Sequence, residues 1–379
     1  MRFPEFSGEW DRIKVSDLLE FYPTNSLSWE QLDYSGEGIF NLHYGLIHKG
    51  LPTQVDVSEN NLPTIKDEYI PKKMSLCQNG DVAFADASED TNDVAKCIEF
   101  ANCDEKKIVC GLHTIHGRGT QNKTVTGYKG YAFSARPFRE QIRRLAQGTK
   151  IYSINSHNFS ECYIGIPCKE EQSKISNLLH TVDLRIATQI KIIEKLESLI
   201  KGLCQVLFSF EEYATYLLGD ICSITTGKLD ANAMVEGGKY PFFTCAEDVF
   251  SIDEYAFDTE ALLISGNGAN LGYIHYYNGK FNAYQRTYVL DKFAIDINYV
   301  RLYLESFLKY RIEQEKNTGN TPYIVLGTLS KMKIKVPNTI TQQKISQSIA
   351  SLKEKLSIEK QSHKKYEEQK RYLLSNLFI

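Results

Sequence analysis

Residues 167–208, PCKEEQSKISNLLHTVDLRIATQIKIIEKLESLIKGLCQVLF, decide how this chain folds. Apolar side chains recur along this stretch at alternating intervals of four and three residues, with Gln189 as the polar exception. Their positions are Ile175, Leu179, Val182, Ile186, Ile193, Leu196, Ile200, Leu203 and Leu207. Such a heptad seam is typical of a helix that packs along its length against another helix. Pro167 suits a helix start, so the pattern predicts a rod of roughly 40 residues and about 60 Å.

The same stretch occurs a second time, at residues 337–378. Five residues near its start, Pro337, Gln342, Lys344, Ile345 and Ser346, match Pro167, Gln172, Lys174, Ile175 and Ser176 at one fixed offset. The approach to each stretch also matches, with Gly148-Thr149 against Gly319-Asn320. This offset is far longer than the period of a solenoid, so the repeat indicates duplication of a half-chain. The simplest packing of the two helices is against each other, with a globular segment before each.

Both globular segments carry short strand-like runs between turns. In the first, the runs are 39–50, 80–88 and 106–115, followed by an arginine-rich helix at 136–147. In the second, the runs are 239–244, 261–266, 272–278 and 287–291, followed by a helix at about 298–314. The sequence therefore predicts an α+β fold with two mixed α/β globular units and two long helices. The arginines of 136–147 are either phosphate contacts or part of a solvated helix face.

Composition is that of a globular protein, with 42% hydrophobic and 24% charged residues. The net charge of −3 neither indicates nor excludes a nucleic-acid partner, because local patches decide this. No apolar run approaches the length of a membrane span, and MRFPEFSGEW lacks the apolar core of a secretion signal. We therefore expect a cytoplasmic protein whose nine cysteines are reduced and mostly buried.

The sequence contains no motif for catalysis. Gly266-Asn267-Gly268 lacks the Lys-Ser/Thr of a P-loop and the spacing of a dinucleotide fingerprint, so it is a tight turn, either near a ligand backbone or a plain one. His113 and His116 lie close together, but no further ligands at metal-site spacing accompany them. We therefore predict no catalytic residue, no cofactor and no metal ion in this chain, and interpret it as a binding module.

Four ordered features give the chain a family resemblance. They are Arg2-Phe3-Pro4-Glu5-Phe6 with Trp10, the stretches 80–88 and 111–114, the helix entry with Pro167, Glu171, Gln172 and Ile175, and the second entry with Gln342, Gln343 and Ile345. Over essentially its full length the chain resembles the specificity subunit of type I restriction–modification enzymes. It departs from the family at Thr341, where Glu is usual before Gln342.

The resemblance implies two target recognition domains joined by an antiparallel pair of long helices. The expected boundaries are 1–166 and 210–336 for the recognition domains, and 167–209 and 337–379 for the helices. Each domain would read one half of a split DNA target, and the helices would set the spacer. Family members bind two methyltransferase subunits, which carry S-adenosylmethionine, and motor–nuclease subunits, which use ATP and Mg²⁺. None of that catalysis would belong to this chain.

Candidate DNA contacts lie on polar, glycine-punctuated loops and turns in both globular segments. In the first they are His113, Thr114, Arg118 and Lys123. In the second they are Lys239, Tyr240, Asn267, Asn270 and Arg286. Each of these side chains has a purely structural alternative.

Two other functions stay open at this point. A coiled-coil adaptor with protein-binding heads would differ from a DNA reader in salt dependence, because phosphate contacts weaken steeply as salt rises. An enzyme with an unrecognised site would show turnover by the isolated chain.

Overall fold

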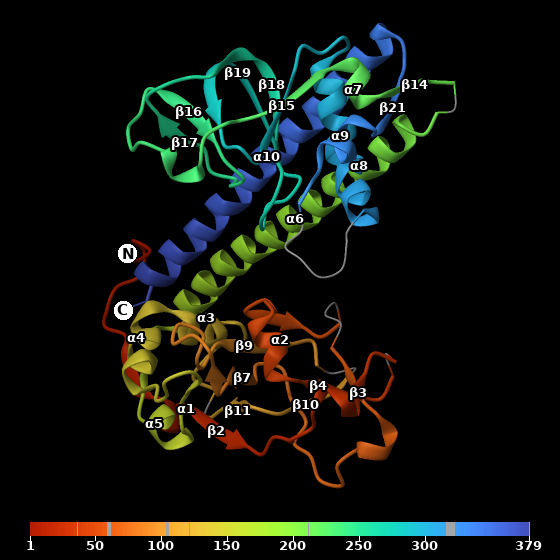
Figure 1. Ribbon diagram of the computed structural model, residues 1–379. Coiled ribbons are helices and arrows are strands. Elements are labelled where there is room, and N and C mark those ends of the chain that lie inside the picture. Colours follow the sequence, from red (N-terminus) through yellow and green to blue (C-terminus); the bar gives the residue numbers. More distant parts are fainter. Residues whose placement is uncertain are drawn as a thin grey trace. The chain divides into compact units, whose positions relative to one another are not determined.

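The computed structural model describes residues 1–35, 37–58, 62–103, 106–120, 122–210, 212–315 and 323–378. Gly319 and Asn320, which the sequence matches to Gly148 and Thr149, lie outside these residues. The chain forms two compact units, Met1–Ile190 with Gln361–Ile379, and Lys191–Lys360. The long helices α6 (Lys169–Leu207) and α10 (Thr339–Asn376) contribute to both (Figure 1). Each unit therefore combines one globular head with a segment of each long helix.

The first head contains two main sheets. One has the strand order β2 (Leu19–Tyr22), β11 (Thr114–Gly119), β7 (Val82–Ala85), β9 (Cys97–Ala101) and β5 (Gln54–Asp56). The other has the order β10 (Lys107–Cys110), β4 (Ile39–Leu42), β6 (Thr64–Ile65) and β3 (Leu32–Asp33). Helices α3 (Tyr128–Ser134) and α4 (Arg136–Leu145) follow, and a short pair joins β8 (Ala87–Ser88) to β12 (Tyr152–Ser153). Both sheets are mixed, because β5 and β9, and β10 and β4, pair in parallel.

Strand β7 separates two hydrophobic cores in this head. Its side chains alternate between the two faces, as in any strand. Phe84 packs into a core with Phe133 and Phe138 of the helices, whereas Ala83 and Ala85 belong to a core on the opposite face. All four residues of the strand are buried, which explains its uninterrupted apolar sequence.

The second head is built on one six-stranded sheet. The order is β15 (Ser223–Thr226), β20 (Thr287–Asp291), β18 (Phe257–Ser265), β19 (Ile274–Ala283), β16 (Tyr240–Phe243) and β17 (Phe250–Ile252). Strand β18 again feeds two cores, with Leu262 and Ile264 on the side of α8 (Ile297–Gln314) and Leu263 on the other.

One expected strand is in part a helix. Residues 39–50 form β4 and then α2 (Tyr44–His48), because the side chain of His43 caps the helix by accepting a hydrogen bond from the Gly45 amide at 3.1 Å. The alternating apolar residues that suggested one strand over 39–50 continue by chance into the residues of this short helix. The helix predicted at 136–147 is confirmed as α4, and that predicted at 298–314 as α8.

The duplication extends from the helices into the base of each head. A two-stranded antiparallel sheet forms each base, β1 (Asp11–Lys14) with β13 (Tyr163–Ile166), and β14 (Ala214–Leu217) with β21 (Lys333–Val336). Short helices flank both bases, α1 (Val15–Leu18) and α5 (Ser156–Ser160) at the first, α7 (Leu218–Ile221) and α9 (Leu326–Ser330) at the second. One tyrosine ties each helical layer to its base strand: the hydroxyl of Tyr128 donates to the Gly165 carbonyl at 2.6 Å, and that of Tyr299 to the Lys335 carbonyl at 2.6 Å.

A buried glutamine anchors each long helix in the same way. The amide nitrogen of Gln172 donates to the Pro167 carbonyl, and that of Gln342 donates to the Pro337 carbonyl, both at 2.8 Å. The amide oxygens accept from the head, Gln172 from the Val125 amide at 2.9 Å and Gln342 from the Asp296 amide at 3.1 Å. Each glutamine therefore joins the start of a long helix to its own head.

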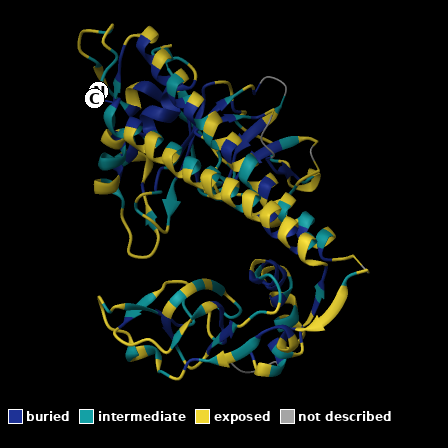
Figure 2. Cartoon of the chain, turned by 90° about the horizontal axis from the view of Figure 1, so that it is seen from above, coloured by how far each residue is buried: buried dark blue, intermediate teal, exposed yellow. Residues whose placement is uncertain are grey.

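The heptad seam is the contact face of α6 in both units. Every residue of the heptad seam is buried or half-buried, including Gln189, whereas Leu184, Ile190 and Leu199 between them are exposed (Figure 2). In the first unit α6 packs on the end of α10, where Lys370 and Asp183 form an ion pair at 2.6 Å. In the second it packs on the beginning of α10, with Lys360 and Glu197 paired at 2.6 Å. Within each unit the helices are thus antiparallel, as the predicted fold class requires.

None of the described helices has an apolar stretch that is long enough to cross a membrane.

Candidate nucleic-acid interface

A row of aromatic and imidazole rings lies on the first head, and we call it the ring group. Its members are Trp29, His43, Tyr44, His48 and His113. Successive ring centroids are 4.3 Å apart between Trp29 and His43, 4.7 Å between His43 and Tyr44, and 5.2 Å between Tyr44 and His113. Trp29 and His113 are exposed, so flat apolar faces and polar ring nitrogens reach the surface together.

Local backbone geometry positions these rings. His113 adopts a left-handed conformation (φ 55°) in the turn between β10 and β11, and its Nδ1 lies 3.2 Å from Asp86 Oδ1. Burial lowers the pKa of His43, and the nearby charges of His113 and Lys49 lower it further. His43 is therefore a neutral ring at physiological pH. The Lys49 ammonium lies 5.5 Å from the Trp29 ring and adds a positive charge at the edge of the group.

Two of the candidate contacts in this head, Thr114 and Arg118, have hydrogen-bond partners within the head. Thr114 is buried, and its hydroxyl donates to the Gly111 carbonyl at 2.6 Å. The guanidinium of Arg118 donates to both carboxylate oxygens of Asp81, at 2.9 and 2.8 Å, and stacks 4.5 Å from the Tyr22 ring. These groups have hydrogen-bond partners inside the head, and DNA contact by Thr114 and Arg118 stays a prediction.

Lys123 does not lie with His113. The two residues come from opposite ends of β11, and the backbone carbonyl of Lys123 accepts from the Gln172 amide at 3.0 Å. Its backbone thus helps to anchor α6, while its side chain is half-exposed near the helix start.

The second head brings three of its five expected residues to one edge, which we call the Arg286 edge. The Gly266 amide donates to the Arg286 carbonyl at 2.9 Å, and Asn267 pairs with Tyr323 in an isolated bridge. Asn270 lies in the adjoining turn, where its carbonyl accepts from the Tyr273 amide. A Cβ atom at Gly266 would come within 2.3 Å of the Arg286 carbonyl, so only glycine permits this close approach.

Lys239 and Tyr240 lie at a different place in this head. The Tyr240 and Tyr255 rings have centroids 5.0 Å apart, and the Lys280 ammonium lies 4.6 Å from the Tyr255 ring. These residues form the Tyr240–Tyr255 cluster, an exposed combination of aromatic rings and positive charge with Lys239 at its edge. Sequence patterns gave no sign of Tyr255 or Lys280, because their partners are distant in the chain.

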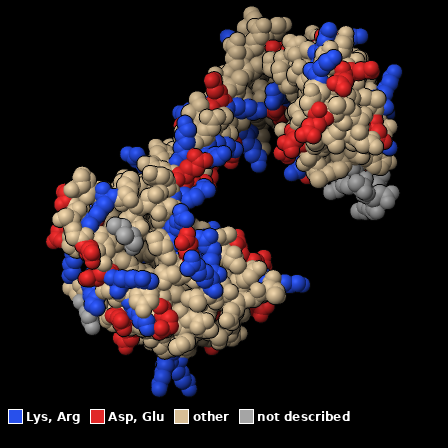
Figure 3. Space-filling view, turned by 90° about the vertical axis from the view of Figure 1, so that its left-hand side faces the viewer, with Lys and Arg blue, Asp and Glu red and all other residues tan. Residues whose placement is uncertain are grey.

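Charge is distributed in small groups. On the face in Figure 3, lysines and arginines alternate with acidic residues and do not form one continuous basic surface. The arginines of α4 illustrate this: Arg136 pairs with Glu140 at 2.7 Å, and Arg139 donates to the Asn92 carbonyl at 2.7 Å, whereas Arg143 and Arg144 are exposed. Both heads therefore present polar and aromatic side chains at the surface, in addition to isolated positive charges.

The family model of the type I restriction modification DNA specificity domain matches residues 9–198 and 211–368. The chain belongs to this family. The family model matches each half of this specificity-domain protein once, which agrees with the repeated bases and glutamine anchors. The family and fold class predicted from the sequence are thereby confirmed.

Relatives of this specificity-domain protein have been described by sequence and by structure. It is 40% identical over 141 residues to the type I restriction enzyme EcoDI specificity subunit of Escherichia coli, and this match covers 37% of the chain and 31% of that subunit. The fold is similar to the crystal structure of the type I restriction–modification system S subunit from M. genitalium, with a TM-score of 0.64 and 19% identity over 100% of this chain and 99% of the other. A chain from a study of complex assembly and conformational transition of the type I R-M system matches with a TM-score of 0.56 and 14% identity, over 98% of this chain and 97% of that one.

Proposed function

We propose that this chain is a DNA specificity subunit of a type I restriction–modification complex, in which each head reads one half of a bipartite target. The single observation that carries the proposal is the family match to both halves of a duplicated chain. Two similar heads that differ in their exposed side chains suit a target with two different halves. Two moderate half-site contacts combine into one tight contact when the heads are joined by a fixed scaffold.

The partners follow from the same proposal. The chain would bind double-stranded DNA directly, with the long helices setting the spacer and docking two methyltransferase subunits. Motor–nuclease subunits would join through the assembled complex. S-adenosylmethionine, ATP and Mg²⁺ would be held by those partner subunits, and this chain would supply no catalytic residue.

We infer that the ring group and the Arg286 edge contact the DNA. Aromatic faces pack on sugars and unstacked bases, and an arginine or asparagine forms paired hydrogen bonds with base edges in the major groove. The ring group offers the exposed Trp29 and His113, and the Arg286 edge offers Asn267, Asn270 and the exposed Arg286. The Tyr240–Tyr255 cluster is a further candidate for phosphate contact through Lys239 and Lys280.

The function is tested by mapping methylated adenines across the genome with this chain present and with its gene deleted, in cells that retain the methyltransferase partner. The expected result is a split sequence motif that loses methylation on deletion. An unchanged map, with assembly of the complex demonstrated, would reject the proposed role. The same map supplies the target sequence for binding measurements.

Arg286→Ala is expected to weaken binding of the assembled complex to its target by about 1–3 kcal/mol, roughly 5- to 150-fold. The loss should affect only the half-site that the second head reads. Substitution of that half-site in the DNA should therefore weaken binding of the variant little further. Lys331→Ala, which removes an exposed lysine at the end of α9, is the matched control and should bind like the wild type. Equal losses in both variants would mean that Arg286 contributes only general charge.

A further inference from the structure

Two cysteines and a histidine meet inside the first head. Cys77 precedes β7, Cys110 ends β10 and His116 lies in the middle of β11. Their ligand atoms all lie within 4.8 Å of one another, and all three residues are buried. The fold thus places two cysteines beside His116 that the spacing of the sequence did not reveal, and the absence of a metal ion stays a prediction. The cluster was hidden in the sequence because its members come from three separate segments.

The spacing of the sulfur atoms fits a shared metal ion. Cys77 Sγ and Cys110 Sγ are 3.6 Å apart. Two thiolates bound to one tetrahedral zinc ion, each at about 2.3 Å, are about 3.7 Å from each other. The sulfur atoms of a disulfide, by contrast, are about 2.05 Å apart. The backbone holds the pair in place, because the Cys77 amide donates to the Ile108 carbonyl at 2.8 Å and Leu76 pairs with Val109.

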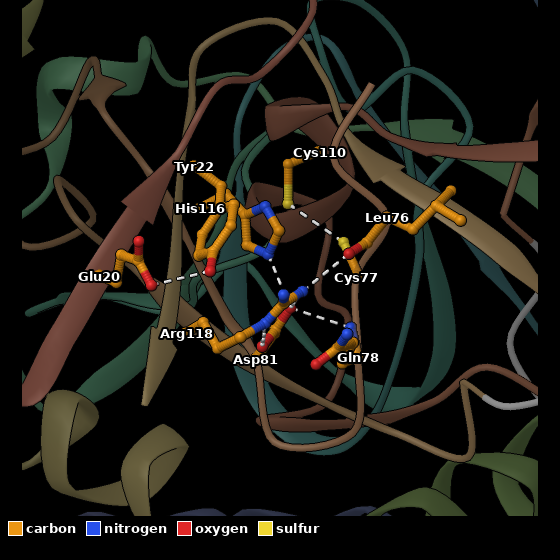
Figure 4. A network of polar contacts seen from close by, with 9 residues as sticks. All are labelled: Glu20, Tyr22, Leu76, Cys77, Gln78, Asp81, Cys110, His116 and Arg118. Carbon is orange, nitrogen blue, oxygen red and sulfur yellow. Dashed lines mark hydrogen bonds and ion pairs between the residues drawn. The ribbon is translucent and has the colours of Figure 1, made fainter. Parts of the chain in front are cut away.

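The histidine is oriented for a ligand on the side of the sulfur atoms. His116 Nε2 lies 2.8 Å from Asp81 Oδ2, and Asp81 is fixed by the guanidinium of Arg118 and by the Gln78 amide. The histidine is 0% exposed, so its other ring nitrogen, Nδ1, cannot bond to solvent, and it has no hydrogen-bond partner in the protein. Figure 4 shows Asp81 and Arg118 on one side of the imidazole and the two sulfur atoms on the other. Histidines that bind metals usually donate their second nitrogen to a carboxylate in this manner.

We propose that Cys77, Cys110 and His116 bind a zinc ion, with Asp81 as the residue that orients His116. Two thiolates with an imidazole favour zinc over magnesium or calcium, which prefer oxygen ligands. The three residues supply three of the four ligands of a tetrahedral zinc ion, and a water molecule would complete the set. Binding replaces the thiol protons, which are released to solvent.

The site would stabilise the head as a crosslink. Cys110 belongs to the four-stranded sheet and His116 to the five-stranded sheet, and Cys77 precedes the strand between the two cores. A zinc ion would therefore join the two sheets on which the ring group is supported, because His113 lies in the turn that links Cys110 to His116.

The test uses the full chain purified with its methyltransferase subunits from zinc-supplemented cells under reducing conditions. Elemental analysis is expected to find about one zinc per chain. Cys77→Ser and Cys110→Ser should lose this zinc, whereas Cys97→Ser, a buried cysteine of the other core, should retain it. Asp81→Asn should weaken zinc affinity by about 10- to 100-fold.

A second measurement does not depend on the variants folding. Wild-type complex stripped by a chelator and titrated with Co²⁺ should develop thiolate-to-cobalt charge-transfer absorption and the visible bands of a tetrahedral ion. Zinc at background in the wild type, together with no cobalt spectrum, would overturn the proposal in favour of a hydrogen-bonded thiol pair. An intact mass lower by two hydrogens under non-reducing conditions, with no metal, would overturn it in favour of a disulfide.

Discussion

Removing one matched heptad from α6 and one from α10 is expected to shorten the DNA spacer while both half-site sequences stay the same. Seven residues of helix correspond to about 10 Å, or up to about three base pairs. A whole heptad keeps the seam facing its partner within about 20°, so both units retain their helix packing. Each base pair also rotates the duplex by roughly 34–36°, so a shorter spacer turns one half-site relative to the other. Three base pairs is therefore an upper bound on the change in spacer length. The measurement is a genome-wide methylation map of cells that carry the shortened chain.

The control for this experiment is a deletion of two residues from α6 alone. Because each residue turns the helix by about 100°, this deletion rotates the following seam residues, Leu196, Ile200 and Leu203, by about 160° and takes them off the contact face. We expect this chain to lose methylation of any split motif. A matched deletion that alters a half-site sequence and leaves the spacer unchanged would contradict the role of the helices as the element that sets the spacing.

Glu99→Gln is expected to destabilise the first unit by about 3–5 kcal/mol. Glu99 of β9 and Lys129 of α3 form an ion pair with 3.2 Å between Nζ and Oε1, and their side chains are only 1% and 5% exposed. The Gly130 amide also donates to Glu99 Oε2 at 2.8 Å. A glutamine can keep that last bond, but it leaves the Lys129 ammonium buried without an anion. Hydrogen exchange of the β7 and β9 amides measures the loss.

The double variant Glu99→Gln with Lys129→Met distinguishes the pair from general packing. It should recover most of the lost stability, because neither charge remains in the core. Lys14→Met, which breaks an exposed pair with Glu161, should leave the exchange rates unchanged. If Glu99→Gln were as stable as the wild type, the charge of Lys129 would have to be satisfied elsewhere.

The same carboxyl group gives a pH dependence. Burial raises the pKa of Glu99, and Lys129 only partly offsets this. The folded unit therefore binds more protons than the unfolded chain between the ordinary pKa of 4.5 and the raised one. Stability should fall as the pH rises through this window, and Glu99→Gln should lack that slope.

The long helices could be predicted from the sequence because their pattern is local and long. A seam of 3.5-residue period over five heptads has no common alternative, and identical residues at one offset reveal a duplication without any structure. The matching tyrosines, in contrast, do not follow that offset. Tyr128 and Tyr299 are separated by one residue more than Gln172 and Gln342, so a fixed offset does not align them.

The candidate contacts were harder to predict because their roles depend on partners that are distant in sequence. Arg118 has the composition and setting of a DNA contact, yet Asp81 binds it across the sheet. Trp29 and His113 are linked through His43 and Tyr44, and Tyr44 lies in a helix that follows a strand-like sequence. In the second head, the turn at Gly266 was visible in the sequence, and so three of five residues do lie together.

The order of synthesis has a consequence for the first head. Leu373, Leu377 and Phe378 belong to its main core, and Phe378 packs edge-on against Trp10 at 6.2 Å. These residues leave the ribosome roughly 200 residues after the head itself, about 10–40 s later at ordinary elongation rates. The second unit, in contrast, is one continuous segment, Lys191–Lys360. The head that is made first is therefore completed last, and until then its core lacks these three apolar side chains.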